Sequence, residues 1–267
     1  MRKTTMLKDL KIFKVLLSVI WLALGVYSYK LDSYNQRVIF FDVGQGDSIL
    51  IQRDNFEILI DGGADDSVVY KMSEYMKWSD RVIDVVIITH MHDDHYMGIK
   101  HLMERYEIGV FLLSPNCGGL CAEFKEYNYI EISDGMSMHY DDINIDILWP
   151  RVGVLDKNLN NDSIVLLVRY LDKKFLLMGD AEKEVESILA DNYGVNITNI
   201  DVLKAGHHCS KTASTLGFLK LTNPDISICS CGEENRFGHP HKKTLDNFKE
   251  LNLEYYITWE EGDYVVE

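Results

Sequence analysis

Five side chains that can bind metal cations or transfer protons lie within six residues: His90, His92, Asp93, Asp94 and His95. Imidazole and carboxylate groups together suit zinc, manganese or iron(II), whereas a site made only of oxygen atoms suits calcium or magnesium. Four such groups at the spacing H-x-H-x-D-H rarely coincide by chance, so a surface loop that is merely rich in histidine is the weaker interpretation. The stretch predicts a site for one or two divalent cations.

The element that positions this stretch is the apolar run 82–88, which directly precedes it. The run is short, rich in β-branched residues and bounded by polar ones, so it predicts a buried strand that ends just before His90. We expect the loop after the strand to turn His90 and His92 one way and Asp94 and His95 the other.

Further polar groups follow other apolar runs along the chain. Asp180 follows the predicted strand 174–178, and a carboxylate at such a position can bridge two cations about 3.5–4 Å apart. His207 and His208 follow a third apolar run. Seven of the nine histidines fall in three clusters, at 90–95, 207–208 and 239–241. Convergence of these clusters on one pocket explains the distribution more simply than three unrelated surface loops.

The rest of the chain alternates strands and helices. Three predicted strands, a β-meander, are joined by tight turns and end in Asp61-Gly62-Gly63, where two glycines permit a sharp reversal. A second helix is expected to open at Tyr96, with Gly98 small enough for close packing. The predicted strands are 37–43, 48–52, 56–60, 109–113, 143–149, 164–168 and 174–178, and the first helix predicted after residue 30 is 67–78.

Taken together, the motifs resemble the metallo-β-lactamase-like domain of the ComEC competence family, within the metallo-β-lactamase superfamily. The resemblance implies a mixed α/β fold, a four-layered αββα sandwich with a one- or two-metal site. It runs in order from Phe40 to about His241. The matching motifs are 41–48 (FDVGQGDS), 61–63 (DGG), 90–95 (HMHDDH), 160–163 (NNDS), 179–180 (GD), 206–211 (GHHCSK) and 236–240 (RFGHP).

The resemblance also implies a ligand set for two cations, Zn²⁺ or Mn²⁺. A third histidine found in many superfamily members is replaced here by the block 160–163, so the first cation would be held by His90, His92 and bridging Asp180. Asp61 would brace the metal loop from below. The second cation would be held by Asp94, His95, Asp180 and His207.

The chain departs from the family pattern at two places. The large multispanning channel portion of ComEC proteins is absent, and Cys209 stands where the family usually has a glycine. A thiol there could bind a cation or simply pack, and packing is favoured. The count of five cysteines is odd, which is not typical of a disulfide framework, although Cys117 and Cys121 could close a small loop. A four-cysteine zinc site is disfavoured by the spacings.

The implied chemistry is hydrolysis. Two cations lower the pKa of a shared water toward neutrality and neutralise charge that builds on a phosphoryl or carbonyl oxygen. His239, Arg236 and Lys211 are expected to face the pocket and to hydrogen-bond an anionic substrate or protonate its leaving group. With Asp94 they form the candidate catalytic set. His208 remains open between a supporting residue and a substrate contact.

The N-terminal segment 1–30 has a different composition from the rest of the chain. It carries six basic residues against Asp9 before and around an apolar core, which predicts an N-terminal apolar helix that serves as an export signal or a membrane anchor. Residues 31–267 would then form one domain outside the cytoplasm, membrane-anchored or secreted. The whole chain has a formal charge of −15, so this domain is near −20. Such acidity disfavours nucleic acid as a partner.

We therefore predict a metal-dependent hydrolase that acts on phosphodiesters, either as a nuclease or on a small or polymeric anionic substrate. Hydrolysis of another ester or thioester is an alternative within the same superfamily. From a different class, the domain could be a non-catalytic binding module of the cell envelope that keeps the fold.

Overall fold

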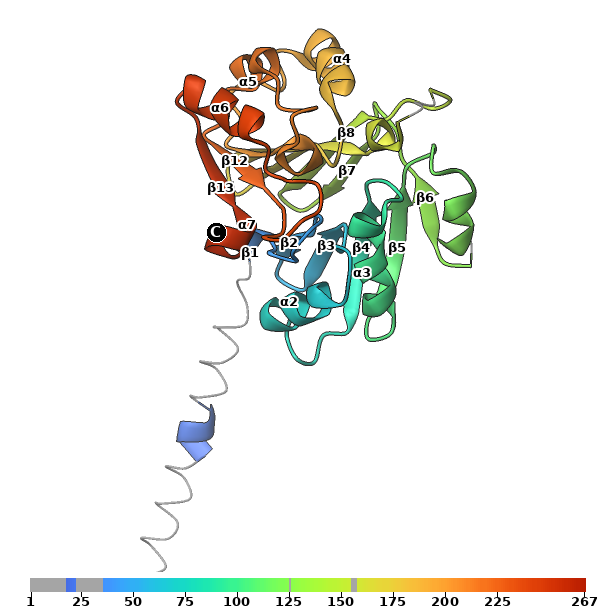
Figure 1. Ribbon diagram of the computed structural model, residues 1–267. Coiled ribbons are helices and arrows are strands. Elements are labelled where there is room, and N and C mark those ends of the chain that lie inside the picture. Colours follow the sequence, from blue (N-terminus) through green and yellow to red (C-terminus); the bar gives the residue numbers. More distant parts are fainter. Residues whose placement is uncertain (1–17, 23–35, 125, 155–157) are drawn as a thin grey trace, which may run out of the picture.

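Two seven-stranded sheets face each other in the computed structural model, which describes residues 18–22, 36–124, 126–154 and 158–267 (Figure 1). The strand order of the first sheet is β14-β1-β2-β3-β4-β5-β6, and that of the second is β13-β12-β11-β10-β9-β8-β7. The first-sheet strands are β1 (Gln36–Phe40), β2 (Ile49–Arg53), β3 (Phe56–Ile60), β4 (Val82–Ile88), β5 (Glu107–Leu113), β6 (Tyr129–Glu131) and β14 (Tyr264–Val266). The second-sheet strands are β7 (Ser137–Tyr140), β8 (Ile143–Trp149), β9 (Val165–Tyr170), β10 (Lys173–Leu177), β11 (Val202–Lys204), β12 (Ile226–Cys229) and β13 (Glu254–Ile257).

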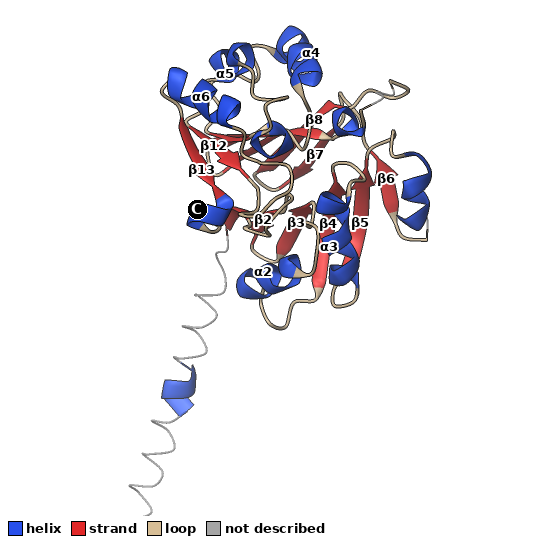
Figure 2. Ribbon diagram, viewed as in Figure 1, coloured by secondary structure: helices blue, strands red, loops and turns tan. Residues whose placement is uncertain are grey.

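Helices cover the outer faces of both sheets (Figure 2). On the first sheet lie α2 (Ser67–Tyr75) and α3 (Asp93–Met103), and on the second lie α4 (Lys183–Tyr193), α5 (Leu216–Thr222) and α6 (Lys242–Glu250). Four short elements lie in the same domain: η1 (Gly118–Phe124), η2 (Leu159–Asp162), η3 (Gly206–Cys209) and α7 (Thr258–Glu261). The predicted four-layered αββα sandwich is therefore confirmed.

Strand β4 shows why its sequence is apolar at almost every position. Val85 and Ile87 lie in the core between the two sheets, while Val86 and Ile88 lie in the core under α2 and α3. A strand covered on both faces must be apolar on both, so it reads as a continuous run and not as an alternation. The buried neighbours on either side fix the position at which β4 ends, and hence where His90 lies.

The parallel strands bring their carboxyl ends to one edge of the sandwich. Strand β4 is parallel to β3 and β5, and β11 is parallel to β10 and β12. Polar side chains that follow β4, β10, β11 and β12 therefore meet at this edge, as carboxyl ends of parallel strands do in open α/β sheets. This arrangement explains the convergence of distant histidine clusters.

The structure corrects the start of the second helix. Helix α3 begins at Asp93 and not at Tyr96, so Asp94 and His95 lie on its first turn and not in a loop. The close packing expected at Gly98 is confirmed, because its N–H donates to Gly63 O at 3.0 Å and an added Cβ would lie 1.8 Å from Gly62 O. Helix α3 thus rests directly on the Asp61-Gly62-Gly63 turn.

Most of the predicted N-terminal helix lies outside the described residues. Of the segment 1–30, residues 18–22 are described, and they are helical. Among the parts of the chain that the structure describes, none is a helix with the length and hydropathy needed to cross a bilayer.

Four of the five cysteines are paired. Cys117 and Cys121 form a disulfide that closes a small loop, which was one of two alternatives left open by the sequence. A second disulfide joins Cys209 to Cys229, at the end of β12. Packing alone, the role favoured for Cys209, is therefore wrong, as is the expectation that the odd cysteine count leaves no disulfide framework. Cys231 is buried and has a free thiol.

Candidate metal centre

The turn after β3 braces the residues after β4. Asp61 Oδ1 accepts a hydrogen bond from Thr89 N at 2.8 Å, and Oδ2 accepts one from Thr89 Oγ1 at 2.7 Å. His95 Nδ1 donates to the same Oδ2, also at 2.7 Å. All three residues are buried, so the hydrogen bonds fix the ring of His95 with its Nε2 directed away from Asp61. Asp61 occupies the bracing position that the resemblance implied.

One group of potential ligands consists of His90, His92 and Asp180, whose donor atoms lie within 4.8 Å of one another. His90 Nε2 is 3.8 Å from Asp180 Oδ2. Its other ring nitrogen, Nδ1, lies 3.2 Å from Ser163 Oγ, which also accepts a hydrogen bond from Asp180 N at 3.0 Å. Ser163 thus positions both His90 and Asp180.

A second group consists of Asp94, His95 and His208. His208 Nε2 lies 3.3 Å from Asp94 Oδ2 and 3.3 Å from Asp180 Oδ1, and His95 Nε2 is also 3.3 Å from Asp180 Oδ1. Asp180 therefore faces both groups, with Oδ2 toward His90 and Oδ1 toward His95 and His208. This is the bridging position that its place after a strand predicted.

The structure does not bring His207 into the second group. His207 Nδ1 donates to Glu182 Oε1 at 2.9 Å, and its Nε2 lies 3.9 Å from Asp180 Oδ2. Its side chain is 22% exposed, whereas that of His208 is 1% exposed. The position expected for His207 is taken by its neighbour His208, because the backbone turns between them with positive φ at both residues.

A buried ion pair supports the site from below. Lys204, at the end of β11, is fully buried and contacts Asp47, and its Nζ also donates to Gly179 O at 2.8 Å. Asp47 Oδ1 lies 3.3 Å from His208 Nδ1. Burial opposes the charge on Asp47, but Lys204 and His208 lower its pKa below the usual value. Asp47 is thus an ionised carboxylate held against the back of His208.

The donor atoms fit divalent cations. Within the described residues, the Nε2 atoms of His90, His95 and His208 and Oδ1 of Asp180 are buried and make no hydrogen bond. Buried polar atoms are rarely left in this state unless something binds them. Burial lowers the pKa of His95, but the carboxylates of Asp180 and Asp61 outweigh burial and raise this pKa to about 10. An excess of carboxylates therefore attracts positive charge to this place.

A pocket of about 780 Å³ opens onto these groups. His239 lies at its wall, buried, with its ring centroid 5.2 Å from that of His207. Burial and the neighbouring histidines lower the pKa of His239 to about 3. Arg236 and exposed Phe237 line the same pocket, and the guanidinium carbon lies 4.8 Å from the ring centroid of Phe237. The pocket is lined by Gln45, Ala64, Met91, His92, Asp93, Asp94, Asn160, Asp180, His207, His208, Glu234, Asn235, Arg236, Phe237 and His239.

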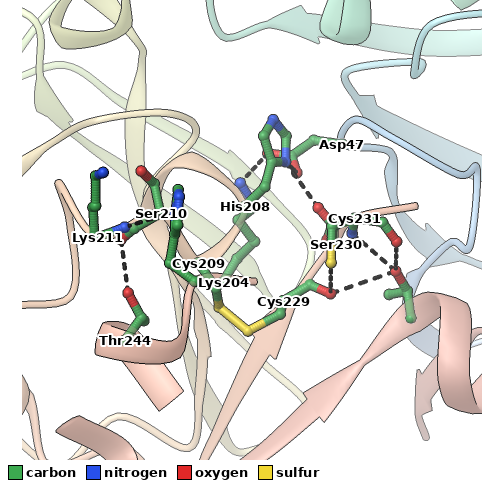
Figure 3. Close-up of a disulfide and its surroundings, with 12 residues drawn as sticks. Asp47, Lys204, His208, Cys209, Ser210, Lys211, Cys229, Ser230, Cys231 and Thr244 are labelled. Carbon is green, nitrogen blue, oxygen red and sulfur yellow. Dashed lines mark hydrogen bonds and ion pairs between the residues drawn. A yellow bond between two sulfur atoms is a disulfide. The ribbon is translucent and has the colours of Figure 1, made fainter. Parts of the chain in front are cut away.

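Lys211 does not take the position predicted for it. It is exposed and is not among the described residues that line the pocket, and Figure 3 shows its side chain directed away from His208. Its backbone N–H donates to His241 Nδ1 at 3.1 Å. Of the predicted catalytic residues, the structure therefore places Asp94, Arg236 and His239 at the pocket and leaves Lys211 outside it.

Three residues that support the site were not predicted from the sequence. Asp47 was assigned only to a tight turn, although the glycines before it allow that turn to reach α3, where Asp47 N donates to Asp94 O at 3.2 Å. Lys204 gave a signal as the one charged residue in an apolar run. Glu182, two residues after Asp180, accepts hydrogen bonds from His207 and from Asn160 Nδ2 at 3.1 Å.

Residues 41–233 match the family described as the metallo-beta-lactamase superfamily. The match spans more than half of the chain and contains both groups of potential ligands. The chain belongs to the metallo-β-lactamase superfamily. Its His- and Asp-rich groups agree with the divalent cations and the hydrolytic chemistry typical of this superfamily.

Two relatives of this metallo-β-lactamase domain are competence and recombination proteins. The chain is 30% identical over 209 residues to recombination protein 2 of Haemophilus influenzae, a match that covers 77% of this chain and 25% of that protein. It is 26% identical over 268 residues to ComE operon protein 3 of Bacillus subtilis, covering 89% of this chain and 34% of that protein. The chain thus spans about a quarter to a third of the length of these curated relatives.

A solved structure shows the same fold. The metallo-β-lactamase fold protein YhfI of Bacillus subtilis superposes with a TM-score of 0.59, and the match covers 86% of this chain and 99% of that one. The identity is 14%, so the likeness concerns the fold alone.

Proposed function

We propose that this chain hydrolyses phosphodiesters with the help of two divalent cations. The observation that carries the proposal is the position of Asp180, which is buried and faces two groups of ligand-type side chains at once. Bridging carboxylates of this kind hold two cations close together in hydrolases that act on phosphate esters. The resulting centre lies at the base of an open pocket.

The chain's own residues would hold the cations in two sets. His90, His92 and Asp180 would hold one, and Asp94, His95, His208 and Asp180 would hold the other. The donor atoms are nitrogen and oxygen, which suits Zn²⁺ and Mn²⁺. When bound, the cations would supply Lewis-acid activation of water at neutral pH and neutralise negative charge on the substrate.

Residues at the pocket favour an anionic substrate. The guanidinium group of Arg236 lies beside the exposed ring of Phe237. A guanidinium group can hydrogen-bond two phosphate oxygens at once. His239 is buried beside them, and its Nδ1 has no hydrogen-bond partner among the described residues. We assign Arg236 to binding of the phosphodiester and His239 to a hydrogen bond with the leaving oxygen. Asp94, ionised and in contact with His208, would orient the attacking water.

Two disulfides support a location outside the cytoplasm. Cys117–Cys121 and Cys209–Cys229 are both formed, and such bonds persist in oxidising compartments but are rare in the cytosol. We therefore propose that residues 31–267 form one extracytoplasmic domain, and that the basic and apolar segment 1–30 exports it or anchors it to the membrane.

Hydrolysis of bis(p-nitrophenyl) phosphate by the full-length chain tests the proposed activity. With added Mn²⁺ or Zn²⁺ we expect turnover, which chelation abolishes and which Asp180→Ala lowers on the order of 100-fold or more, because one side chain serves both cations. His101→Ala is the matched control, since His101 lies on α3 outside the site, and it should retain activity. Two bound cations without hydrolysis of this ester or of DNA would instead indicate a binding module.

A further inference from the structure

The η3 turn that carries His208 has an unusual backbone. His207, His208 and Cys209 all have positive φ, with values of 48°, 52° and 60°. None of them is glycine, and runs of left-handed residues are disfavoured for side chains with a Cβ. Such a turn persists only where the surrounding structure holds it in place. The ties that hold it therefore decide where the His208 ring lies.

Two ties join this turn to the end of β12, and they lie on adjacent residues. Cys209 is bonded to Cys229, and His208 Nδ1 donates to the carbonyl of Ser230 at 2.8 Å (Figure 3). Both cysteines are fully buried in the core between the second sheet and its helices. A third contact, from His241 N to Cys209 O at 3.0 Å, holds the same residue.

The hydrogen bond to Ser230 determines which nitrogen of His208 faces the site. Because Nδ1 carries a hydrogen that is donated to Ser230, Nε2 is left with its lone pair, as a metal ligand requires. That Nε2 lies 3.3 Å from both Asp94 Oδ2 and Asp180 Oδ1. If Cys209 left its left-handed conformation, the ring next to it would turn away from both carboxylates.

We infer that the Cys209–Cys229 disulfide is a positioning element for metal binding: it holds the η3 turn in its left-handed conformation so that His208 completes the second group of ligands. The inference rests on the proposed two-cation site. Cys209 and Cys229 are positioning residues, since they act through His208. Loss of a comparable support lowers metal affinity about 10- to 100-fold.

The inference has a reciprocal consequence that can be measured without catalysis. If the disulfide raises cation affinity about tenfold, a bound cation must shift the disulfide–dithiol equilibrium about tenfold toward the disulfide, or about 30 mV. In this reaction two glutathione thiols become one glutathione disulfide, and the Cys209–Cys229 bond takes up two electrons and two protons. The full chain is equilibrated in glutathione buffers with and without Mn²⁺, and the thiols are then alkylated and identified by mass spectrometry.

The same sample contains its own reference, the Cys117–Cys121 disulfide, which we expect to shift much less. A Cys209–Cys229 equilibrium that is unchanged by Mn²⁺, in a chain that does take up Mn²⁺, overturns the inference. A chain that takes up no Mn²⁺ contradicts the proposed function itself, so the two failures are distinguishable.

Two double variants separate the conformational role of the disulfide from its presence. Cys209→Ala/Cys229→Ala keeps a Cβ at φ 60° without the bond, and we expect one fewer Mn²⁺ per chain after dialysis. Cys209→Gly/Cys229→Ala also lacks the bond, but glycine adopts positive φ freely, so most of the affinity should return. Cys117→Ala/Cys121→Ala is the matched control and should bind like the natural chain. Equal Mn²⁺ binding by the two Cys209 variants would show that the left-handed conformation is not what the bond secures.

Discussion

At the scale of single residues, adjacent positions have opposite surroundings. His207 and His208 follow the same strand, yet His208 is buried against Asp47, Asp94 and Asp180, while His207 is partly exposed and bonded to Glu182. The difference comes from the backbone, which is left-handed at both residues and so turns the two rings to different sides. Assignment of the ligand therefore depends on conformation and not on residue type.

Replacement of each histidine tests this assignment. We expect His208→Ala to bind one divalent cation fewer per chain after dialysis, because the second cation loses one of its four ligands. His207→Ala should keep both cations, because His207 belongs to neither group of ligands and its Nδ1 is bonded to Glu182. Metal analysis and calorimetric titration measure both numbers, and the opposite pattern would restore His207 as the ligand.

Lys204 allows a second test at this scale. Lys204→Met leaves the buried carboxylate of Asp47 without its cationic partner, which should lower the free energy of unfolding by about 3–5 kcal/mol. Asp47→Asn/Lys204→Met removes both charges, so the loss should be smaller than the sum of the two single changes. Urea denaturation of the natural chain, Lys204→Met, Asp47→Asn and the double variant gives the coupling free energy between the two side chains. Strict additivity of the two single changes would contradict a direct interaction between them.

At the scale of elements, a row of polar groups crosses three strands under α2. Arg37 Nε donates to Gln52 Oε1 at 2.8 Å, and Gln52 Nε2 donates to Glu57 Oε1 at 2.9 Å, linking β1, β2 and β3. Arg37 also donates to the carbonyl of Tyr75 at the end of α2. The row ties the helix to the sheet whose next strand, β4, positions the site. Its acidic end is the weak point, because burial raises the pKa of Glu57 to about 7.

The pKa of Glu57 predicts how stability depends on pH. Since the folded-state pKa is raised, the protonated form stabilises the fold fully below about pH 4.5, and this contribution is lost as the pH rises through 7. Glu57→Gln keeps the hydrogen bond with Gln52 and removes the charge. Its stability relative to the natural chain should therefore be about 2 kcal/mol more favourable at pH 8 than at pH 5. Denaturation at the two pH values measures this difference, and equal differences would show that Glu57 titrates normally.

At the scale of the whole molecule, charge opposes binding of long polyanions. The chain has a formal charge of −15, and the part after residue 30 is near −20. Proteins that bind DNA through a basic surface lose affinity as salt rises, because counterions are released on binding. This acidic domain repels the phosphates of DNA, so added salt should screen the repulsion and make binding of DNA more favourable.

Kinetics at two ionic strengths test this charge argument. Between about 20 and 200 mM salt, we expect KM for single-stranded DNA to fall, while KM for bis(p-nitrophenyl) phosphate, with its single charge, changes little. A rise of KM for DNA with salt would indicate a basic path to the pocket and would favour a nuclease with a polymer-binding surface.

Much of the candidate metal centre could be predicted from short stretches of the sequence. Strand β4 and the stretch 90–95 were predicted together, since a continuous apolar run marks a strand buried on both faces and the residues after it are of ligand type. Asp180 was found for the same reason, as the first carboxylate after a buried strand. The resemblance added the sandwich fold and the bracing role of Asp61, both of which the structure confirms.

Other features were decided only by tertiary structure. Residue types could not distinguish His208 from His207, because both are histidines and the left-handed turn that separates them is held by Cys229 and Ser230, about 20 residues away along the chain. Nor could they pair Lys204, at the end of β11 in the second sheet, with Asp47, in the turn between β1 and β2 of the first sheet. Local sequence determines which side chains are available at the ends of strands. Packing between distant strands determines which of them face the same point.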